Sequence, residues 1–432
     1  MSTPSSAARS WLTPDIESAY AWIRLIISLL VVTIGNVGMY AASVVLPMVE
    51  ADFGVGRADA SLPYAATMVG FGLGGIVMGK LSDRSGIFMP VIVGAVALCL
   101  GFLAAGAATH ITVFIIAHGV LIGLLGTSAM FAPMVADASH WFTRHRGIAV
   151  AICLSGNFLA GVVWPPIMQF FMQDHGWRAT YAGIGLFCLA TLVPLAFFLR
   201  RRSPEVEANR RLDLGQAPAT PTPAAHQAAR LQERPLGMSP RALLILLSIA
   251  GVACCVAMAM PQVQIVALCF DLGYGMTNGT NMLSLMLAMG IVSRLLFGML
   301  SDRIGGLRVL LLGSILQTLA LVMYLFSHGL MSLYITSAMF GLFQGGIVPA
   351  YAVIVRDYFS PRHAGTFIGT VLMATMVGMA LGGWMSGAIR DLSSSYQAAF
   401  MNGIAWNVLN AAIVLFLLYR AGGLRRLRPQ AA

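Results

Sequence analysis

The sequence predicts an all-α integral membrane protein whose twelve transmembrane helices form two pseudo-symmetric six-helix bundles. Three observations support this prediction. Of the 432 residues, 58% are hydrophobic and only 10% are charged, whereas about 25% of the residues of a soluble domain are charged. Long apolar runs recur along the chain, and one motif occurs twice, in corresponding places of the two halves. This composition excludes a soluble enzyme, a disordered chain and a nucleic-acid-binding protein.

A helix needs about 20 apolar residues to cross the hydrocarbon core of a bilayer. That criterion predicts twelve spans, at 24–48, 60–80, 88–107, 112–135, 147–172, 178–199, 241–268, 280–300, 307–326, 331–355, 365–388 and 398–420. The long polar segment after the sixth span is rich in arginine, proline and alanine, which is typical of a flexible linker. The expected organisation is a tail at 1–23, a bundle at 24–199, a linker at 200–240, a bundle at 241–420 and a tail at 421–432.

The net charge of +10 is best explained by membrane topology. If both termini are cytoplasmic, 22 of the 26 basic residues face the cytoplasm, in agreement with the positive-inside rule. Arg57, Arg178 and Arg390 then lie in external loops. Arg294 is different, because it lies within a predicted span.

Two motifs recur across the linker. Gly79–Gly86 reads GKLSDRSG after the second span, and Gly298–Gly305 reads GMLSDRIG after the eighth. A second similarity links Trp141–Gly147, before the fifth span, with Tyr358–Gly365, before the eleventh. Repeats in the same order indicate two similar halves, and in transporters built this way the substrate site lies between the halves near the midplane.

The G-x-L-S-D-R-x-G motif resembles the signature loop of the major facilitator superfamily, and the resemblance extends over essentially the whole chain. Four stretches also resemble bacterial transporters of the monocarboxylate and oxalate/formate type: Trp141-Phe142 with Arg144, Arg146 and Gly147; Ser155-Gly156; Gly176-Trp177-Arg178; and Ser293-Arg294. The resemblance implies the major facilitator fold, a bacterial inner-membrane location and proton-coupled symport of a small monocarboxylate.

Arg294 is the main candidate for substrate binding. A charge within a span is costly and usually faces a cavity or a partner, and the guanidinium group matches a carboxylate with two parallel hydrogen bonds. The resemblance implies the same role, because an arginine at this place in helix 8 binds the substrate carboxylate in the family. The alternative is an arginine whose head reaches the cytoplasmic interface.

The sequence departs from the monocarboxylate pattern at informative positions. Gly290 stands where relatives carry an acidic residue that takes part in proton coupling, and the first and eleventh spans lack lysine. A single membrane cation favours a monoanion over a dianion. Organic-anion exchange and efflux by the same fold remain alternatives, and a membrane-embedded sensor is a remote one.

Other polar and aromatic residues within the spans are candidates for lining the substrate path. They are Asn36, Tyr40, Asn157, Trp164, Gln262, Gln264, Gln344 and Tyr351. Each amide group is equally well explained by a hydrogen bond between helices. His118 could carry the coupled proton, because imidazole titrates near neutral pH, but a neutral packing role is the alternative.

The resemblance implies that the two signature motifs close the cytoplasmic side when the cavity opens outward. The residues expected in this gate are Gly79, Asp83, Arg84, Gly86, Arg144, Arg146, Asp302, Arg303 and Arg362. The glycines would allow tight backbone geometry, and the carboxylates would accept hydrogen bonds from arginine or helix ends. A solvated turn is the alternative for these motifs.

No nucleophile–base pair, phosphate-binding glycine loop or metal-ligand cluster occurs in the sequence, so no enzyme activity, cofactor or metal is expected. The six cysteines lie in or beside apolar runs and are expected to be reduced thiols. The expected partners are a small organic anion, protons and the lipid bilayer, with no nucleic acid, and the expected state is a monomer.

Overall fold

The computed structural model describes residues 17–142, 145–201, 235–327, 329–359 and 364–426, and these segments are helical without any strand. By its internal contacts the chain divides into two compact units. The first comprises residues 1–42 and 69–218, and the second comprises residues 43–68 and 219–432. Residues 43–68, which were expected in the N-terminal bundle, group with the C-terminal helices. The bundle boundaries expected from the sequence therefore remain a prediction.

Among the described residues, eleven helical segments are long and apolar enough to cross a membrane. One of them, within α8 (Arg146–Phe198), contains two helices that meet at Gly176, whose φ of 75° and ψ of 164° are not helical. Only glycine adopts this backbone conformation readily. The 53 residues of α8 therefore make two crossings, and the total of twelve agrees with the sequence prediction.

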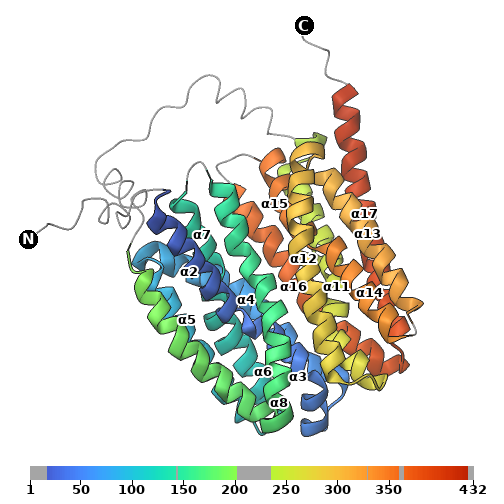
Figure 1. The fold of residues 1–432 in the computed structure, drawn as a ribbon. Helices are drawn as coiled ribbons and strands as arrows, with labels where there is room; N and C mark the ends of the chain where they lie inside the picture. The colour runs from blue at the N-terminus through green and yellow to red at the C-terminus, as the bar shows by residue number, and fades with distance from the viewer. Residues whose placement is uncertain (1–16, 143–144, 202–234, 328, 360–363, 427–432) are drawn as a thin grey trace, which may run out of the picture. The chain divides into compact units, whose positions relative to one another are not determined.

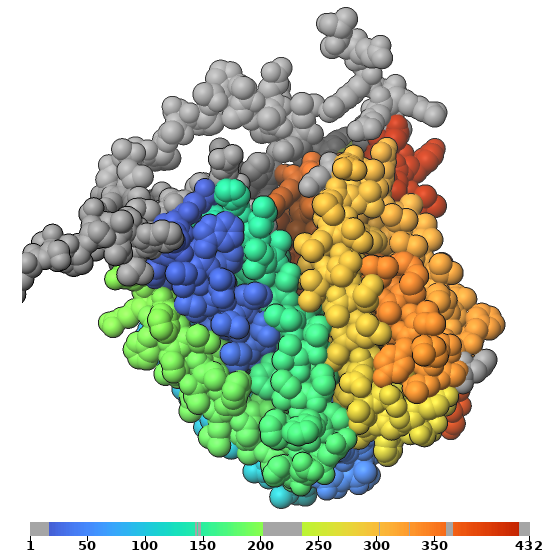
Figure 2. All heavy atoms as spheres, viewed as in Figure 1, coloured from blue at the N-terminus to red at the C-terminus, as the bar shows by residue number. Residues whose placement is uncertain are grey.

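The first unit contains most of the helices that precede the polar segment after the sixth span. Its elements are α2 (Ala19–Gly35), the start of α3 (Val37–Phe53), the later part of α4 (Arg57–Ser85), α5 (Phe88–Gly106), α6 (Ile111–Ile116), η1 (Ala117–Gly126), η2 (Thr127–Met130), α7 (Ala132–His140) and α8. Helix α8 packs along both α2 and α5 (Figure 1). In the space-filling view α2 and α8 lie side by side at the surface (Figure 2).

The fourth span is irregular. Between α6 and α7 the chain passes through the π-helical η1 and the 3-10 turn η2. Glycines of α4 allow a very close approach here: a Cβ on Gly70 would collide with the carbonyl oxygen of Gly119, and one on Gly74 with that of Leu124. π-Helical segments are rare in proteins, and those that occur are often found at functional sites.

The second unit contains the C-terminal spans. Its elements are residues 43–53 of α3, residues 57–68 of α4, η3 (Pro235–Gly237), α11 (Pro240–Asp271), α12 (Met276–Ile304), α13 (Gly306–Leu325), α14 (Leu330–Gln344), α15 (Ile347–Tyr358), α16 (Ala364–Ser393) and α17 (Tyr396–Arg426). Helix α11 packs against α16 and α17, and α12 lies beside α14 (Figure 1).

Buried amides join α17 to α13. Asn407 donates from Nδ2 to the carbonyl oxygen of Ser314 at 2.8 Å, and Asn410 donates to the hydroxyl of Ser314 at 2.7 Å. Both asparagines are fully buried. In a bilayer, such hydrogen bonds between helices replace part of the hydrophobic driving force that water would supply.

Both signature motifs are mainly helical. The first continues α4 to Ser85, and the second continues α12 to Ile304. Each ends at a glycine in the left-handed region, Gly86 (φ 78°) or Gly305 (φ 86°), whose N–H bonds the carbonyl oxygen four residues earlier. The expectation of tight geometry at Gly79 is wrong, because this residue is helical and has open space around an added Cβ.

Candidate functional site

Arg294 lies deep within α12. The helix continues for ten residues after it, to Ile304, which places Arg294 about 15 Å along the axis from this helix end. The side chain is half-buried. A guanidinium group within a membrane span needs polar partners.

Beside Arg294, α12 is in close contact with the junction of α14 and α15. A Cβ added at Gly345 would collide with the carbonyl oxygen of Gly290, and one added at Gly346 would collide with Phe297. The glycine pair thus lets the broken tenth span approach α12 at the level of Arg294. Gly290 is buried at this contact.

Three predicted residues of the first unit lie at the contact of α2 and α3 with α8. Tyr40 donates from its hydroxyl to Oδ1 of Asn157 at 2.8 Å. Trp164 donates from Nε1 to the carbonyl oxygen of Thr33 at 3.0 Å. These side chains therefore already make hydrogen bonds between helices.

Asn36 occupies the junction between α2 and α3 and is fully buried. Its Nδ2 donates to the carbonyl oxygen of Val32 at 2.7 Å. Within the described part of the chain, Oδ1 of Asn36 has no hydrogen-bond partner. Because an unsatisfied buried acceptor is costly, this oxygen is a suitable place for a donor from a ligand or from water.

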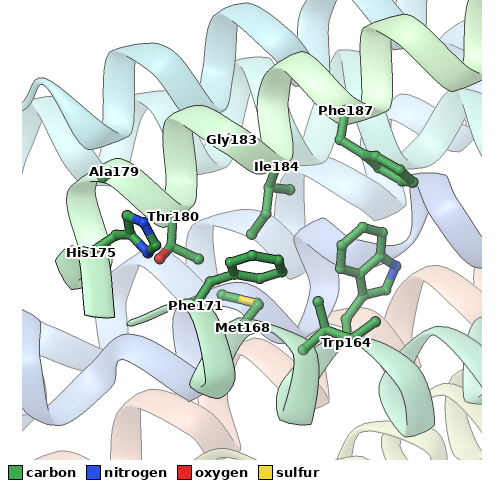
Figure 3. Close-up of a pocket in the computed structure, with 10 residues that line it drawn as sticks. Trp164, Met168, Phe171, His175, Ala179, Thr180, Gly183, Ile184 and Phe187 are labelled. Carbon is green, nitrogen blue, oxygen red and sulfur yellow. The ribbon is translucent and has the colours of Figure 1, made fainter. Parts of the chain in front are cut away.

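Trp164 also lines a groove of about 560 Å³ that lies entirely on the two helices of α8. Figure 3 shows the indole and Phe187 at one end, His175 and Thr180 at the other, and Phe171, Met168 and Ile184 between them. His175 is the only titratable side chain in the lining. The groove therefore offers mainly apolar surface, which suits hydrocarbon rather than the carboxylate of a small anion.

The predicted residues of the second unit fall into two groups. Gln262 donates from Nε2 to Oε1 of Gln344 at 3.2 Å, and Nε2 of Gln344 has no hydrogen-bond partner in the described structure. These two amides lie on α11 and α14, both of which contact α12. They are the candidates most compatible with a site that contains Arg294.

Gln264 and Tyr351 have structural partners instead. Gln264 donates to the hydroxyls of Ser61 and Ser386, at 3.3 and 3.1 Å. Tyr351 is fully buried and donates to Oδ1 of Asn410 at 3.1 Å. Both side chains connect helices of the second unit.

His118 lies in η1 and is fully buried. Its Nε2 is 3.3 Å from the hydroxyl of Tyr181, and its ring is 4.6 Å from the ring of Phe114. Aromatic neighbours favour a neutral imidazole, because burial of a charge away from water is costly. A role in proton transfer remains a hypothesis.

The gate residues are only partly described. Asp83 lines a pocket of about 170 Å³ together with Asp137, His140, Arg200 and Arg201. Arg84 and Arg303 are exposed. Arg144 and Arg362 lie outside the described residues, as do the side chains of Arg146 and Asp302. The structure therefore places Asp83 beside basic groups that the sequence analysis did not name.

Two buried arginine clusters were missed because the sequence analysis assigned their basic residues to topology alone. Arg24 binds Asp137 in the first unit, 113 residues away. Arg57 binds Asp271 in the second unit, 214 residues away. No local spacing in the sequence signals such distant pairs. The sequence shows only that all four residues lie at or beside the ends of predicted spans.

The six cysteines are free and buried, and no group of three potential metal ligands occurs among the described residues.

Comparisons with known proteins are consistent across sequence and structure. The model of the Major Facilitator Superfamily matches residues 28–291 and 279–431. Monocarboxylate transporter 13 of Bos taurus is 25% identical over 346 residues, 80% of this chain and 76% of that protein. An uncharacterized MFS-type transporter of Bacillus subtilis, YcxA, is 25% identical over 86% of this chain and 88% of its own length.

A solved structure has the same fold. The crystal structure of a bacterial homologue of the human lysosomal transporter Spinster, in an inward-facing and unoccupied conformation, superposes with a TM-score of 0.68. It covers 96% of this chain and 99% of its own, at 15% sequence identity. At this identity the likeness concerns the fold alone.

Proposed function

This chain belongs to the major facilitator superfamily, and on that premise we propose that it carries small monocarboxylates together with protons by alternating access. It is a multi-pass membrane transporter and not an enzyme. We further propose that it acts as a monomer in a bacterial cytoplasmic membrane with both termini in the cytoplasm. The excess of basic residues in the predicted cytoplasmic segments supports this orientation.

The observation that carries the proposal is Arg294. The residue lies within a candidate membrane span, ten residues before the end of α12, and is therefore not accounted for by a position in a loop. A guanidinium group cannot practically lose its proton and forms paired hydrogen bonds with a carboxylate. Relatives named monocarboxylate transporters support this substrate class at 24–25% identity.

Gln262 and Gln344 are proposed to assist Arg294, and Asn36, Tyr40 and Asn157 to contribute polar groups from the first unit. The proposed cytoplasmic gate comprises Asp83, Arg84 and Gly86 with the basic residues near them. Trp164, Gln264 and Tyr351 are proposed to support the path through packing, because their polar atoms bond other helices.

The experiment uses purified protein in proteoliposomes with radiolabelled lactate and pyruvate, an acidic exterior and a protein-free control. We expect uptake above the control that a protonophore abolishes. Arg294→Ala should lower uptake at least tenfold, Arg294→Lys less so, and Arg308→Gln, at an exposed arginine of the next helix, should have no effect. Unchanged uptake by Arg294→Ala would refute its assigned role.

Anion exchange is the second candidate, because no acidic residue occupies the middle of a described span. Exchange predicts counterflow of lactate that does not depend on a pH gradient. His118→Gln tests the proton route: loss of gradient-driven uptake with preserved counterflow would support His118 as the proton carrier. Equal gradient-driven uptake would assign His118 to packing.

A further inference from the structure

The groove on the two helices of α8 has a buried floor and exposed rims. Met168 and Ile184 form part of the floor and are buried, whereas Phe171 and Phe187 stand at the rims and are 49% and 48% exposed. Every residue that lines the groove belongs to α8 (Figure 3). The groove therefore lies within one compact unit of the chain.

The two ends of the groove differ in chemistry. At one end the rings of Trp164 and Phe187 meet, with 5.7 Å between their centroids, and the indole N–H already donates to the carbonyl oxygen of Thr33. At the other end lies His175, directly before the turn at Gly176. Because this turn joins two membrane spans, the histidine end lies near the membrane surface and the tryptophan end lies deeper in the bilayer.

Gly183 keeps the middle of the groove open. In the described structure no atom lies within 4 Å of a Cβ added at Gly183. Gly185 is different, because a Cβ added there would lie 3.0 Å from the carbonyl oxygen of Cys99 on α5. Glycine is unfavourable in a helix compared with alanine. Close packing within the protein explains Gly185, whereas Gly183 leaves room for a group from outside the chain.

The dimensions of the groove fit an extended chain better than a helix. Trp164 and His175 are eleven residues apart on one helix, which corresponds to about 16 Å. The groove volume of about 560 Å³ divided by this length gives a mean cross-section of about 35 Å². A helix with its side chains is about 10 Å across, which corresponds to a cross-section of about 80 Å². A helix from a second copy of this chain is therefore too wide for the groove.

Both helices of α8 lie within a candidate membrane span, so the exposed rims face lipid chains. An empty groove would leave its lining without dispersion contacts on one side. We propose that the groove binds one acyl chain of a membrane phospholipid, with the chain end against Trp164 and the head group beside His175. Imidazole can donate a hydrogen bond to a phosphate oxygen and is positively charged when protonated. This inference does not depend on the transport function proposed above.

Photo-crosslinking tests where the chain lies. The full-length protein is placed in nanodiscs of phosphatidylglycerol that contain a small share of the same lipid with a diazirine at the end of one acyl chain. After irradiation, mass spectrometry locates the adducts. We expect at least five times more adduct per exposed residue in the groove than on α13, where Leu312, Ile315 and Leu319 form another exposed apolar face of a candidate membrane span.

The position of the diazirine tests the orientation of the lipid. A diazirine at the chain end should form adducts at Trp164 and Phe187. A diazirine next to the head group should instead form adducts at His175 and Thr180. The same positions for both probes, or the reverse order, would overturn the proposal.

Gly183→Leu places a side chain where the groove is open, so it should lower the groove adducts at least fivefold and leave those on α13 unchanged. Ala179→Leu, one turn earlier on the same face, should act in the same way and serves if Gly183→Leu does not fold. Ala190→Leu is the matched control, because Ala190 is an exposed residue of the same helix outside the groove lining. It should change neither set of adducts.

The melting temperature gives a second readout. A ligand that binds only the folded state stabilises it, so adding phosphatidylglycerol to delipidated protein should raise the melting temperature of the wild type more than that of Gly183→Leu. An equal rise would overturn the proposal. Equal adduct densities in the groove and on α13 of the wild type would reveal contact with bulk lipid alone and would also overturn it. Neither readout uses lactate or pyruvate, so both remain decisive if the protein does not carry them.

Discussion

Two buried arginines hold helix ends together in this protein, and they do so in different ways. In the first unit, Arg24 is 2% exposed and binds both oxygens of Asp137 at 2.9 and 3.0 Å. It also donates to the carbonyl oxygen of Leu199 and lies 4.8 Å from the centre of the Trp141 ring. In the second unit, Arg57 divides its guanidinium group among Glu50, Asp271 and Tyr396.

The difference is in solvent contact and connectivity. The carboxylate bound to Arg24 is 13% exposed, and α2, α7 and α8 all belong to one compact unit. The carboxylates bound to Arg57 are 22% and 30% exposed, and the helices that carry Glu50 and Arg57 continue into the other unit. The same residue type therefore forms a nearly dry ion pair with one carboxylate in the first unit and a more solvated network with two carboxylates in the second.

The largest effect on stability is expected for Arg24→Gln. This change leaves the Asp137 carboxylate buried without its ionic partner, which costs about 3–5 kcal/mol. The melting temperature in detergent should fall strongly, and the yield of folded protein should fall with it. Arg24→Met combined with Asp137→Leu should recover much of the loss, because no isolated charge remains. A melting temperature like that of the wild type for Arg24→Gln would show that the joint is not structural.

Arg57→Gln should lower the melting temperature by less than half as much as Arg24→Gln. Its partners are more exposed, so water can replace the lost ion pairs. Equal losses of stability in both variants would remove the distinction between the two arginines.

The smallest effect is expected for Tyr396→Phe. The Tyr396 hydroxyl accepts from Arg57 and donates to Asp271 at 2.6 Å, and a neutral hydrogen-bonding group contributes about 1 kcal/mol. The ion pairs of Arg57 remain, so the melting temperature should fall by less than in Arg57→Gln. A fall as large as that of Arg57→Gln would show that the tyrosine hydroxyl, and not the charges, holds these helix ends together.

Much of the fold could be predicted because hydrophobic length and repetition are local signals. The twelve crossings, the duplicated motif and the position of Arg294 within a span all follow from short stretches of residues. Gly176 lies between the fifth and sixth predicted spans, and its left-handed backbone separates two crossings that are otherwise one continuous helical segment.

The candidate site was less predictable, because the sequence lists polar residues without their partners. Gln262 and Gln264 are two residues apart on one helix, yet Gln262 bonds Gln344 whereas Gln264 bonds Ser61 and Ser386. Likewise Tyr351 turns out to bond Asn410 in the packed interior. Which amide remains available for a ligand depends on the helix that lies opposite.

The sequence by itself determined that this chain spans a membrane in two similar halves and that one arginine has no topological explanation. Only the tertiary structure decided that Arg24 and Arg57, both apparently topological, are buried in ion-pair clusters with acids 113 and 214 residues away. The physical reason is range: burial of apolar surface is encoded within each span, whereas a charge is stabilised by partners that only folding brings near.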